Sequence, residues 1–274
     1  MKLPDLDLAV VTYGPEGMER VAKMLPEPAE GVRYVVSWQA SEAKPLPDLL
    51  RGRSDVEVHR IESKGISLNR NNALAHCTAD IILFADDDLT LYPEGLTELR
   101  KAFAENPDVD VATFRSDHGD MSRFPTAKTI LGTRLPKNYY VSGIEIALRR
   151  SSAGALCWCP ELGLGVPRLH GGEDELFVLS AIRRGLKCCF FPITICAHPH
   201  PSTGTKRNPT PGNLRGAGCT IALTYPLSWP LRVPLKAWRL RRQGAKNILR
   251  SLYYLFCGAA MAPGVLRRNR DTLW

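Results

Sequence analysis

Short apolar runs alternate with longer segments of helical periodicity along the first two thirds of the chain. Runs that are apolar throughout are typical of strands buried on both faces of a sheet, and the segments between them are long enough for crossover helices. We therefore predict an α/β protein with a mostly parallel sheet. The predicted strands are residues 6–12, 32–38, 56–61, 81–86, 109–114, 139–148 and 187–197, and the predicted helices are residues 16–24, 66–76, 96–105 and 173–184.

Two stretches lose this periodicity and gain Gly, Pro and polar residues. They are residues 115–138 and residues 159–172. Long connections without secondary structure are uncommon in compact domains unless they have a function. We therefore expect both stretches to be loops, and the length of the first indicates a functional role.

Three consecutive aspartates, Asp86, Asp87 and Asp88, follow the apolar run that begins at Ile81. Open α/β sheets bind ligands at the carboxyl ends of their strands, which is where these side chains are expected. Neighbouring carboxylates repel one another, so a divalent metal is the simplest candidate partner. A solvated turn that caps the next helix is the alternative interpretation.

The order and spacing of several short motifs resemble the inverting family 2 glycosyltransferases of the GT-A fold. The motifs are Thr12-Tyr13 at a strand end, G-x-S-x-x-R-N-x-A at residues 65–73, D-x-D at Asp86 and Asp88, Tyr92-Pro93, GGED at residues 171–174, and a histidine after the last strand. Each motif is weak alone, but the set is fairly specific. The resemblance implies a Rossmann-like sheet flanked by helices in residues 1–204, divided into a nucleotide-binding half (1–115) and an acceptor-binding half (116–204).

The resemblance also implies transfer of a sugar from a nucleotide-diphosphate sugar to an acceptor hydroxyl, with inversion. It assigns Asp86 to the ribose, Asp88 to Mn²⁺ or Mg²⁺, and Asp174 to the role of general base. Oxygen ligands suit these hard cations, and an ionised carboxylate in reach of a hydroxyl can accept its proton. The other residues expected to bind the nucleotide sugar are Thr12, Tyr13, Gln39, Arg70 and Asp87, and Asp87 could instead stabilise the turn. His198 or His200 is expected to bind the metal, and His198 is favoured. Gly172 and Glu173 are expected on the acceptor side.

Each of these roles has a structural alternative. Glu173 and Asp174 could complement the dipole at a helix start, where their ionised forms are favoured, and Arg70 could lie on a helix surface. Trp38 is expected in the core. Asp86, Asp88 and Thr90 also satisfy the D-x-D-x-T motif of haloacid-dehalogenase-like phosphatases, with the first aspartate as nucleophile. A non-catalytic nucleotide-sugar-binding protein is the third possibility for the whole chain.

Basic residues are concentrated near the carboxyl end. Of the 36 Lys and Arg residues, 13 follow residue 200, together with a single acidic residue, Asp271. The net charge of +8 therefore divides into +12 for residues 201–274 and −4 for the first 200 residues. We expect residues 205–274 to form a basic helical tail. No recognised nucleic-acid-binding module surrounds these charges, so no nucleic acid partner is expected.

An apolar stretch at residues 252–266 lies within this tail and contains Gly258, Pro263 and Gly264. It is shorter than the roughly 20 residues that cross a bilayer, so we predict an interfacial helix on the anionic cytoplasmic membrane surface. That location favours a lipid-linked acceptor, as in cell-surface polysaccharide synthesis. A helix packed on the catalytic domain with a basic outer face is the alternative.

The eight cysteines lack the spacing of zinc sites, and the amino-terminal sequence lacks the charged and apolar regions of a signal peptide. We therefore expect reduced, mostly buried thiols in a cytoplasmic protein that is peripheral at the inner face of the membrane.

Overall fold

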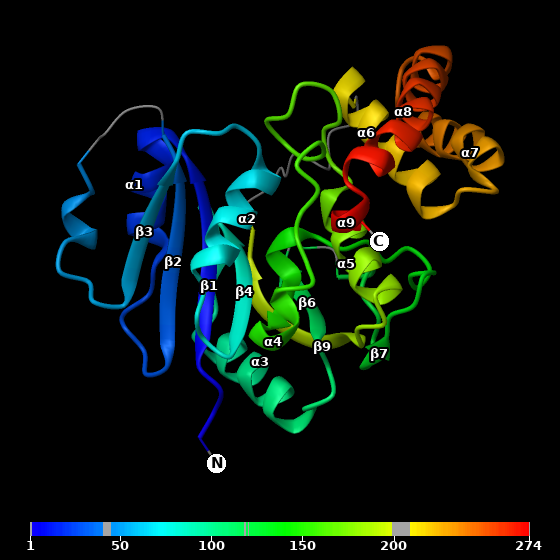
Figure 1. The fold of residues 1–274 in the computed structure, drawn as a ribbon. Coiled ribbons are helices and arrows are strands. Elements are labelled where there is room, and N and C mark those ends of the chain that lie inside the picture. Colours follow the sequence, from blue (N-terminus) through cyan, green and yellow to red (C-terminus); the bar gives the residue numbers. More distant parts are fainter. Residues whose placement is uncertain (1, 41–44, 118, 120, 199–208, 274) are drawn as a thin grey trace.

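The computed structural model describes residues 2–40, 45–117, 119, 121–198 and 209–273. A central sheet in the order β3-β2-β1-β4-β8-β6-β9-β5, with β7 paired to β9, is flanked by helices (Figure 1). The predicted α/β arrangement of a sheet between helices is confirmed.

The first half of the fold is a parallel unit of four strands. Its elements are β1 (Leu6–Tyr13), α1 (Gly14–Met24), β2 (Val32–Gln39), η1 (Asp48–Leu50), β3 (Val56–Ile61), α2 (Ile66–His76) and β4 (Ile81–Asp86). All five apolar residues of β4 are buried, as expected for a strand covered on both faces. The predicted strands and helices of this half are confirmed to within about two residues.

The second half of the sheet is mixed rather than parallel. Its elements are β5 (Thr90–Leu91), α3 (Pro93–Glu105), β6 (Val111–Asp117), β7 (Thr129–Ile130), η2 (Gly143–Glu145), β8 (Ile146–Arg149), α4 (Arg150–Ala153), α5 (Glu173–Arg183) and β9 (Cys188–Ala197). Strand β8 lies between β4 and β6 and is antiparallel to both, whereas β6 and β9 are parallel. The prediction of a mostly parallel sheet therefore holds only for the first half.

The predicted strand at residues 139–148 is wrong in its first part. Ser142 caps the short helix η2, and the Glu145 carboxylate accepts a hydrogen bond from the Ser142 N–H at 3.2 Å. The same carboxylate is buried and bonded to Arg123 and Ser116. A buried polar turn interrupts the apolar run here, so only Ile146–Arg149 pairs as a strand.

Alternate side chains of β1 enter two different apolar cores. Leu6, Leu8 and Val10 pack in the core that contains residues of α1 and α3. Ala9 and Val11 pack in the core that contains residues of α2 and α5. The first half is thus a layered α/β/α structure, and the carboxyl ends of its parallel strands lie at one edge (Figure 1).

The carboxyl-terminal residues form helices at the end of the molecule away from β3 (Figure 1). They are α6 (Pro211–Thr224), α7 (Trp229–Arg242), α8 (Ile248–Arg268) and α9 (Arg270–Leu273). A third core joins them to α5 and to residues 159–169 through side chains such as Leu162, Leu176 and Leu255. Glu161 accepts two hydrogen bonds from the Arg268 guanidinium, at 2.9 and 2.7 Å. These helices pack on α5 and on the loop before it, as the alternative interpretation of the tail expected.

Helix α8 is longer than the apolar stretch that the sequence indicated. It has 21 residues, and within the described part of the chain it is the one helix long and apolar enough to cross a membrane by length and composition alone. Gly258 does not interrupt it: a Cβ there would lie 2.0 Å from the Arg215 carbonyl oxygen of α6. The glycine therefore serves a close contact between two helices.

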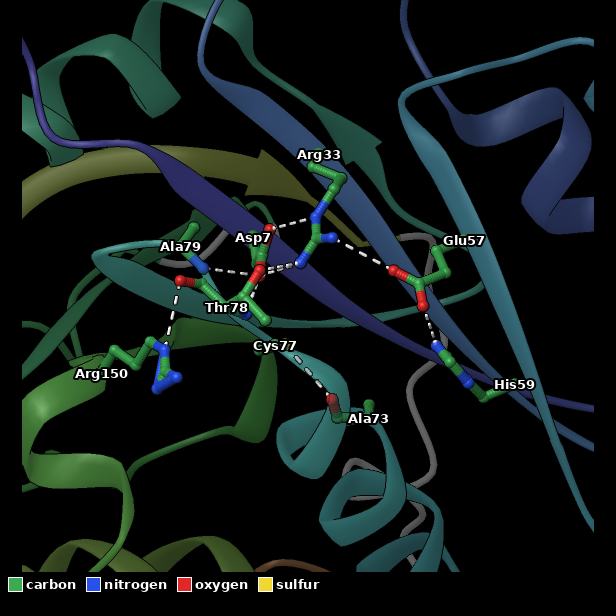
Figure 2. Close-up of polar contacts among 9 residues, drawn as sticks. All are labelled: Asp7, Arg33, Glu57, His59, Ala73, Cys77, Thr78, Ala79 and Arg150. Carbon is green, nitrogen blue, oxygen red and sulfur yellow. Dashed lines mark hydrogen bonds and ion pairs between the residues drawn. The ribbon is translucent and has the colours of Figure 1, made fainter.

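A polar cluster closes the opposite edge of the sheet, at the amino ends of the strands (Figure 2). The fully buried Asp7 carboxylate accepts hydrogen bonds from Arg33 at 2.9 and 2.8 Å and from the Thr78 and Ala79 N–H groups at 2.6 and 3.0 Å. Arg33 also bonds Glu57 at 3.1 Å. Burial alone would raise the pKa of Asp7, but Arg33 and the two N–H groups hold it below its usual value.

Candidate active site

The predicted donor-side residues lie at the carboxyl ends of neighbouring strands. Strands β2, β1 and β4 are adjacent and parallel and end at Gln39, Tyr13 and Asp86. The Gln39 amide donates to the Ser63 and Gly65 carbonyl oxygens at 2.7 and 3.0 Å. Gly65 has φ 122, which favours glycine, and it directly precedes α2. Gln39 thus holds the loop that starts α2, a contact that the sequence did not indicate.

Tyr13 and Trp38 differ in exposure. Tyr13 is 66% exposed at the end of β1. Trp38 is buried, and its indole N–H donates to the Gly14 carbonyl oxygen at 2.8 Å. The expectation that Trp38 belongs to the core is confirmed.

The three consecutive aspartates have three different sets of partners. Asp87 accepts hydrogen bonds from the Thr12 hydroxyl at 2.5 Å and from Arg20 at 2.9 and 3.1 Å. Burial raises the pKa of Asp87, although Thr12 and Arg20 oppose the shift. A Cβ at Gly17 would lie 2.2 Å from the Thr12 hydroxyl oxygen, so glycine allows α1 to approach this pair. These contacts fit a role for Asp87 in the turn.

Asp88 lies beside His198, which follows β9. Strand β5 pairs Thr90 with Ala197, and the Asp88 Oδ1 atom is 3.5 Å from His198 Nε2. Asp88 Oδ1 is shielded from solvent and has no hydrogen-bond partner among the described residues. A shielded carboxylate oxygen with unused acceptor capacity beside an imidazole nitrogen fits a divalent cation.

Asp88 and His198 would be a partial ligand set for such a cation. Within the described residues there is no group of three or more His, Cys, Asp and Glu side chains that could hold a metal ion. Mg²⁺ in particular often keeps water and substrate phosphate oxygens as ligands, so a partial protein set suits it. His200 lies outside the described residues.

Arg70 is the centre of the site. It lies on α2 and is buried, and its Nη2 atom is 3.2 Å from Asp86 Oδ1 while its Nη1 atom is 2.7 Å from Asp174 Oδ1. Glu173 Oε1 is 4.0 Å from the same Nη1 atom. Burial alone would lower the pKa of Arg70, but Asp174, Asp86 and Glu173 raise it, so the guanidinium stays charged. The interpretation of Arg70 as a surface residue is wrong.

Two residues that the sequence did not single out shape the surroundings of Arg70. The guanidinium carbon lies 4.5 Å from the centre of the buried Trp158 ring, a cation–π distance. A Cβ at Gly143 would lie 2.3 Å from Arg70 Nη2, so a glycine leaves room for the guanidinium. Asn71, next to Arg70, bonds the Trp158 backbone at 2.7 and 2.9 Å and fixes that ring. No local pattern marks Trp158 or Gly143, because both reach the site through long-range contacts.

Asp174 and Glu173 begin α5 after Gly172, which has the left-handed φ of 90. Burial raises the pKa of Asp174 even though Arg70 opposes the shift, and a backbone hydrogen bond from Gly143 also opposes it. Burial and repulsion from Asp174 raise the pKa of Glu173 to about 8. The helix start therefore does not keep these carboxyls at their ordinary acidity. A carboxylate with a raised pKa is a stronger base than an exposed one.

Most predicted site residues are brought together around Arg70 and the end of β4. Asp86, Arg70, Glu173 and Asp174 form one ion-pair cluster, and Thr12 and Asp87 form a second pair beside it. Glu173 is buried, and its carboxylate is directed toward Arg70 (Oε1 to Nη1, 4.0 Å). The predicted acceptor-side role of Glu173 and Gly172 stays a prediction.

Comparison with known proteins finds a family that part of the chain resembles. Residues 40–156 match the model of glycosyl transferase family 2. The pre-mycofactocin glycosyltransferase of Mycobacterium tuberculosis (strain CDC 1551 / Oshkosh) is 29% identical over 200 residues, which cover 67% of this chain and 40% of that protein. The chain thus spans less than half the length of the curated relatives that it matches.

Two solved structures share the fold along almost the whole chain. S. aureus TarS 1–349 in complex with UDP-GlcNAc has a TM-score of 0.58 at 15% identity, covering 97% of this chain and 92% of that one. The mannosyltransferase PcManGT from Pyrobaculum calidifontis, in complex with GDP-Man and Mn²⁺, has a TM-score of 0.58 at 16% identity, covering 98% and 76%. At this identity the likeness concerns the fold.

Proposed function

We propose that this chain is a glycosyltransferase that transfers a sugar from a nucleotide-diphosphate sugar to an acceptor hydroxyl with inversion. The match of residues 40–156 to glycosyl transferase family 2 and the likeness to a glycosyltransferase over 200 residues support this proposal. One observation carries this proposal. Arg70 bonds the donor-side Asp86 and the candidate base Asp174 at the same time, at 3.2 and 2.7 Å. Arg70 therefore connects the donor side of the predicted reaction centre, at Asp86, to the candidate base, Asp174. The likeness to glycosyl transferase family 2 favours this proposal over the phosphatase alternative.

The reaction is a single displacement at the anomeric carbon. Asp174 accepts the proton of the acceptor hydroxyl while the hydroxyl oxygen bonds to the anomeric carbon. The bond from that carbon to the diphosphate oxygen breaks, and the nucleoside diphosphate departs with the electron pair. The raised pKa of Asp174 increases its strength as a base, and the hydrogen bond from Arg70 orients its carboxylate. Displacement from the face opposite the leaving group inverts the anomeric configuration.

Asp88 and His198 are the residues that would hold a divalent cation, and Asp86 would contact the ribose. The shielded Asp88 Oδ1 atom, 3.5 Å from His198 Nε2, supports this assignment. A bound Mn²⁺ or Mg²⁺ would supply positive charge that offsets the negative charge of the diphosphate. Tyr13, exposed at the end of β1, is available to the nucleotide. Gln39 holds the loop before α2 and would act through that loop.

The acceptor is proposed to be a lipid-linked hydroxyl in cell-surface polysaccharide synthesis, at the cytoplasmic face of the membrane. This part of the proposal rests on the basic character of residues 201–274, which carry 13 of the 36 Lys and Arg residues. Anionic leaflets attract such segments.

A thermal-shift panel tests the donor-side proposal. Nucleoside diphosphates and nucleotide sugars are added with and without Mn²⁺ to the intact protein and to Asp88→Asn. A ligand at about 100 times its Kd stabilises the native state by about 2.7 kcal/mol, so a correct nucleotide should raise the Tm by several degrees. The Mn²⁺-dependent part of that shift should disappear in Asp88→Asn. An equal Mn²⁺-dependent shift in both proteins would refute the assignment of Asp88.

A further inference from the structure

Helices α7 and α8 carry large apolar side chains on the faces that point away from the third core. On α7 and the turn before it, Leu227 and Leu231 are 97% and 80% exposed, and Leu235 and Trp238 are about half exposed. Residues 231, 235 and 238 have the spacing of one helical face. The corresponding stripe on α8 is Leu249, Tyr253 and Phe256. We call the α7 set, Leu231, Leu235 and Trp238, the α7 stripe.

Elsewhere in the described chain, large exposed apolar side chains are dispersed. They are Tyr13, Leu49, Ile130, Tyr140 and Leu164, which belong to separate segments. Single exposed apolar residues are normal on soluble proteins, whereas grouped ones mark interaction surfaces. The grouping on α7 and α8 is therefore the feature that needs a partner.

The α7 stripe lies among exposed cations. Arg239 and Arg241 fall on either side of it by helical spacing, and Arg242 places its guanidinium 5.0 Å from the centre of the Trp238 ring. No acidic residue occurs between residues 201 and 270. Apolar and aromatic side chains flanked by arginines suit the boundary between acyl chains and anionic headgroups.

Helix α8 is fixed to the rest of the protein by its inner face. Ser251, Leu255, Gly258 and Val265 are buried there. A Cβ at Gly218 of α6 would lie 2.0 Å from the Leu255 carbonyl oxygen, so the two helices meet backbone to backbone. Crossing a bilayer would require α8 to leave this contact and expose the third core. The structure therefore favours a helix pair that lies on a membrane over a helix that spans one.

We infer that the α7 stripe inserts into the headgroup boundary of an anionic bilayer, with the outer face of α8 beside it. A second copy of the chain is a poorer partner, because it would bring two sets of uncompensated arginines together. An anionic bilayer complements both the charge and the apolar stripe.

This surface is connected through α6 to the helix that carries the candidate base, and in this respect the inference rests on the proposed function. Helix α6 packs between them: a Cβ at Gly172 would lie 1.9 Å from the Thr220 hydroxyl oxygen. Gly172 immediately precedes Glu173 and Asp174. Membrane contact through α7 and α8 would thus hold the start of α5 at a fixed position relative to the lipid surface.

Flotation of the full chain with lipid vesicles tests the inference. The protein is mixed with vesicles of phosphatidylcholine alone or with phosphatidylglycerol, without donor or acceptor. We expect binding to the anionic vesicles that weakens with salt, and a loss of more than about tenfold in the partition coefficient for Leu231→Ser/Leu235→Ser/Trp238→Ser. The control, Leu49→Ser/Ile130→Ser, removes apolar side chains of similar exposure elsewhere and should bind like the parent.

A charge variant and two further measurements separate the possible outcomes. Arg239→Gln/Arg241→Gln/Arg242→Gln should lose the preference for phosphatidylglycerol. Absence of vesicle binding by the parent, or undiminished binding by the stripe variant, would overturn the inference. A dimer in light scattering that the stripe variant dissociates, without vesicle binding, would assign the surface to a second copy and also overturn it. Nucleotide thermal shifts on the same variants report the proposed function separately, because the stripe lies outside the donor site.

Discussion

The two edges of the same parallel sheet carry charged clusters with opposite balances of donors and acceptors. At the amino ends of the strands, one buried carboxylate, Asp7, accepts four hydrogen bonds from Arg33 and two N–H groups. At the carboxyl ends, one buried guanidinium, Arg70, is shared by three carboxylates. The pKa of Asp7 is lowered, whereas the pKa values of Glu173 and Asp174 are raised.

This difference separates a structural cluster from a functional one. The partners of Asp7 hold elements of the fold together: Arg33 joins β2 to β1, and the Thr78 and Ala79 N–H groups attach the turn between α2 and β4. Around Arg70, by contrast, Arg70 Nε and Glu173 Oε2 are buried without a hydrogen-bond partner in the described part of the protein. Unsatisfied buried polar atoms cost stability and gather where a ligand completes the arrangement. The Asp7 carboxylate, with four hydrogen bonds, stabilises the fold, whereas the unpaired polar atoms around Arg70 leave room for a ligand.

The largest effect is expected from a substitution in the cluster at the carboxyl ends of the strands. Asp174→Asn removes the proposed proton acceptor while keeping the side-chain shape, so the transfer rate should fall by about 10²–10⁴-fold. Nucleotide binding measured by thermal shift should persist. Product formation from the donor found in the nucleotide panel is the measurement. Asp7→Asn is the matched control at the other edge, and its transfer rate should equal that of the parent at temperatures below its lowered Tm. Equal transfer rates for Asp174→Asn and the parent would show that Asp174 is not the general base.

The second largest effect is expected from a substitution in the cluster at the amino ends of the strands. Asp7→Asn leaves Arg33 without its buried carboxylate, so the free energy of unfolding should fall by about 2–4 kcal/mol, measured in urea at neutral pH. Because the pKa of Asp7 is lowered in the folded state, its contribution is present above the unfolded pKa of about 3.9 and is lost as the pH falls through the folded value. The difference between parent and variant should therefore shrink in acid. A difference that stays constant down to the folded pKa would contradict the ion-pair account.

The smallest effect concerns Glu173, and its pH dependence has the opposite sign. The pKa of Glu173 is raised to about 8, so its contribution to stability is complete below the unfolded pKa and is lost as the pH rises toward 8. Glu173→Gln removes this loss, so its free energy of unfolding relative to that of the parent should rise by roughly 1–2 kcal/mol between about pH 5 and pH 9. Urea midpoints at the two pH values measure it, with Glu175→Gln on the same helix for comparison. Parallel curves for Glu173→Gln and the parent would show that Glu173 ionises normally.

Prediction from sequence was accurate where local periodicity governs the structure. Strand β4 has the predicted bounds because its run of five apolar residues is buried on both faces of the sheet. Prediction was inaccurate at residues 139–148, where Glu145 turns inward to Arg123 and Ser116. An inward carboxylate cannot be recognised without its distant partners.

In the basic tail, residues 205–274, too, local features were predicted from the sequence, whereas features that depend on packing were not. Its basic and apolar composition was visible in the chain, and Gly258 and Pro263 suggested a broken, short helix. In the structure α8 continues through both, because Gly258 lies against the backbone of α6. The length of the helix and the choice of its exposed face were decided by packing.

The sequence by itself determined the alternation of strands and helices, the excess of positive charge near the carboxyl end, and the residue types of the candidate site. Those properties follow from neighbouring residues along the chain. The tertiary structure alone decided that Arg70 joins Asp86 to Asp174 beneath Trp158, and that β8 enters the sheet antiparallel between β4 and β6. Such contacts join residues distant along the chain, and their geometry depends on how the layers pack.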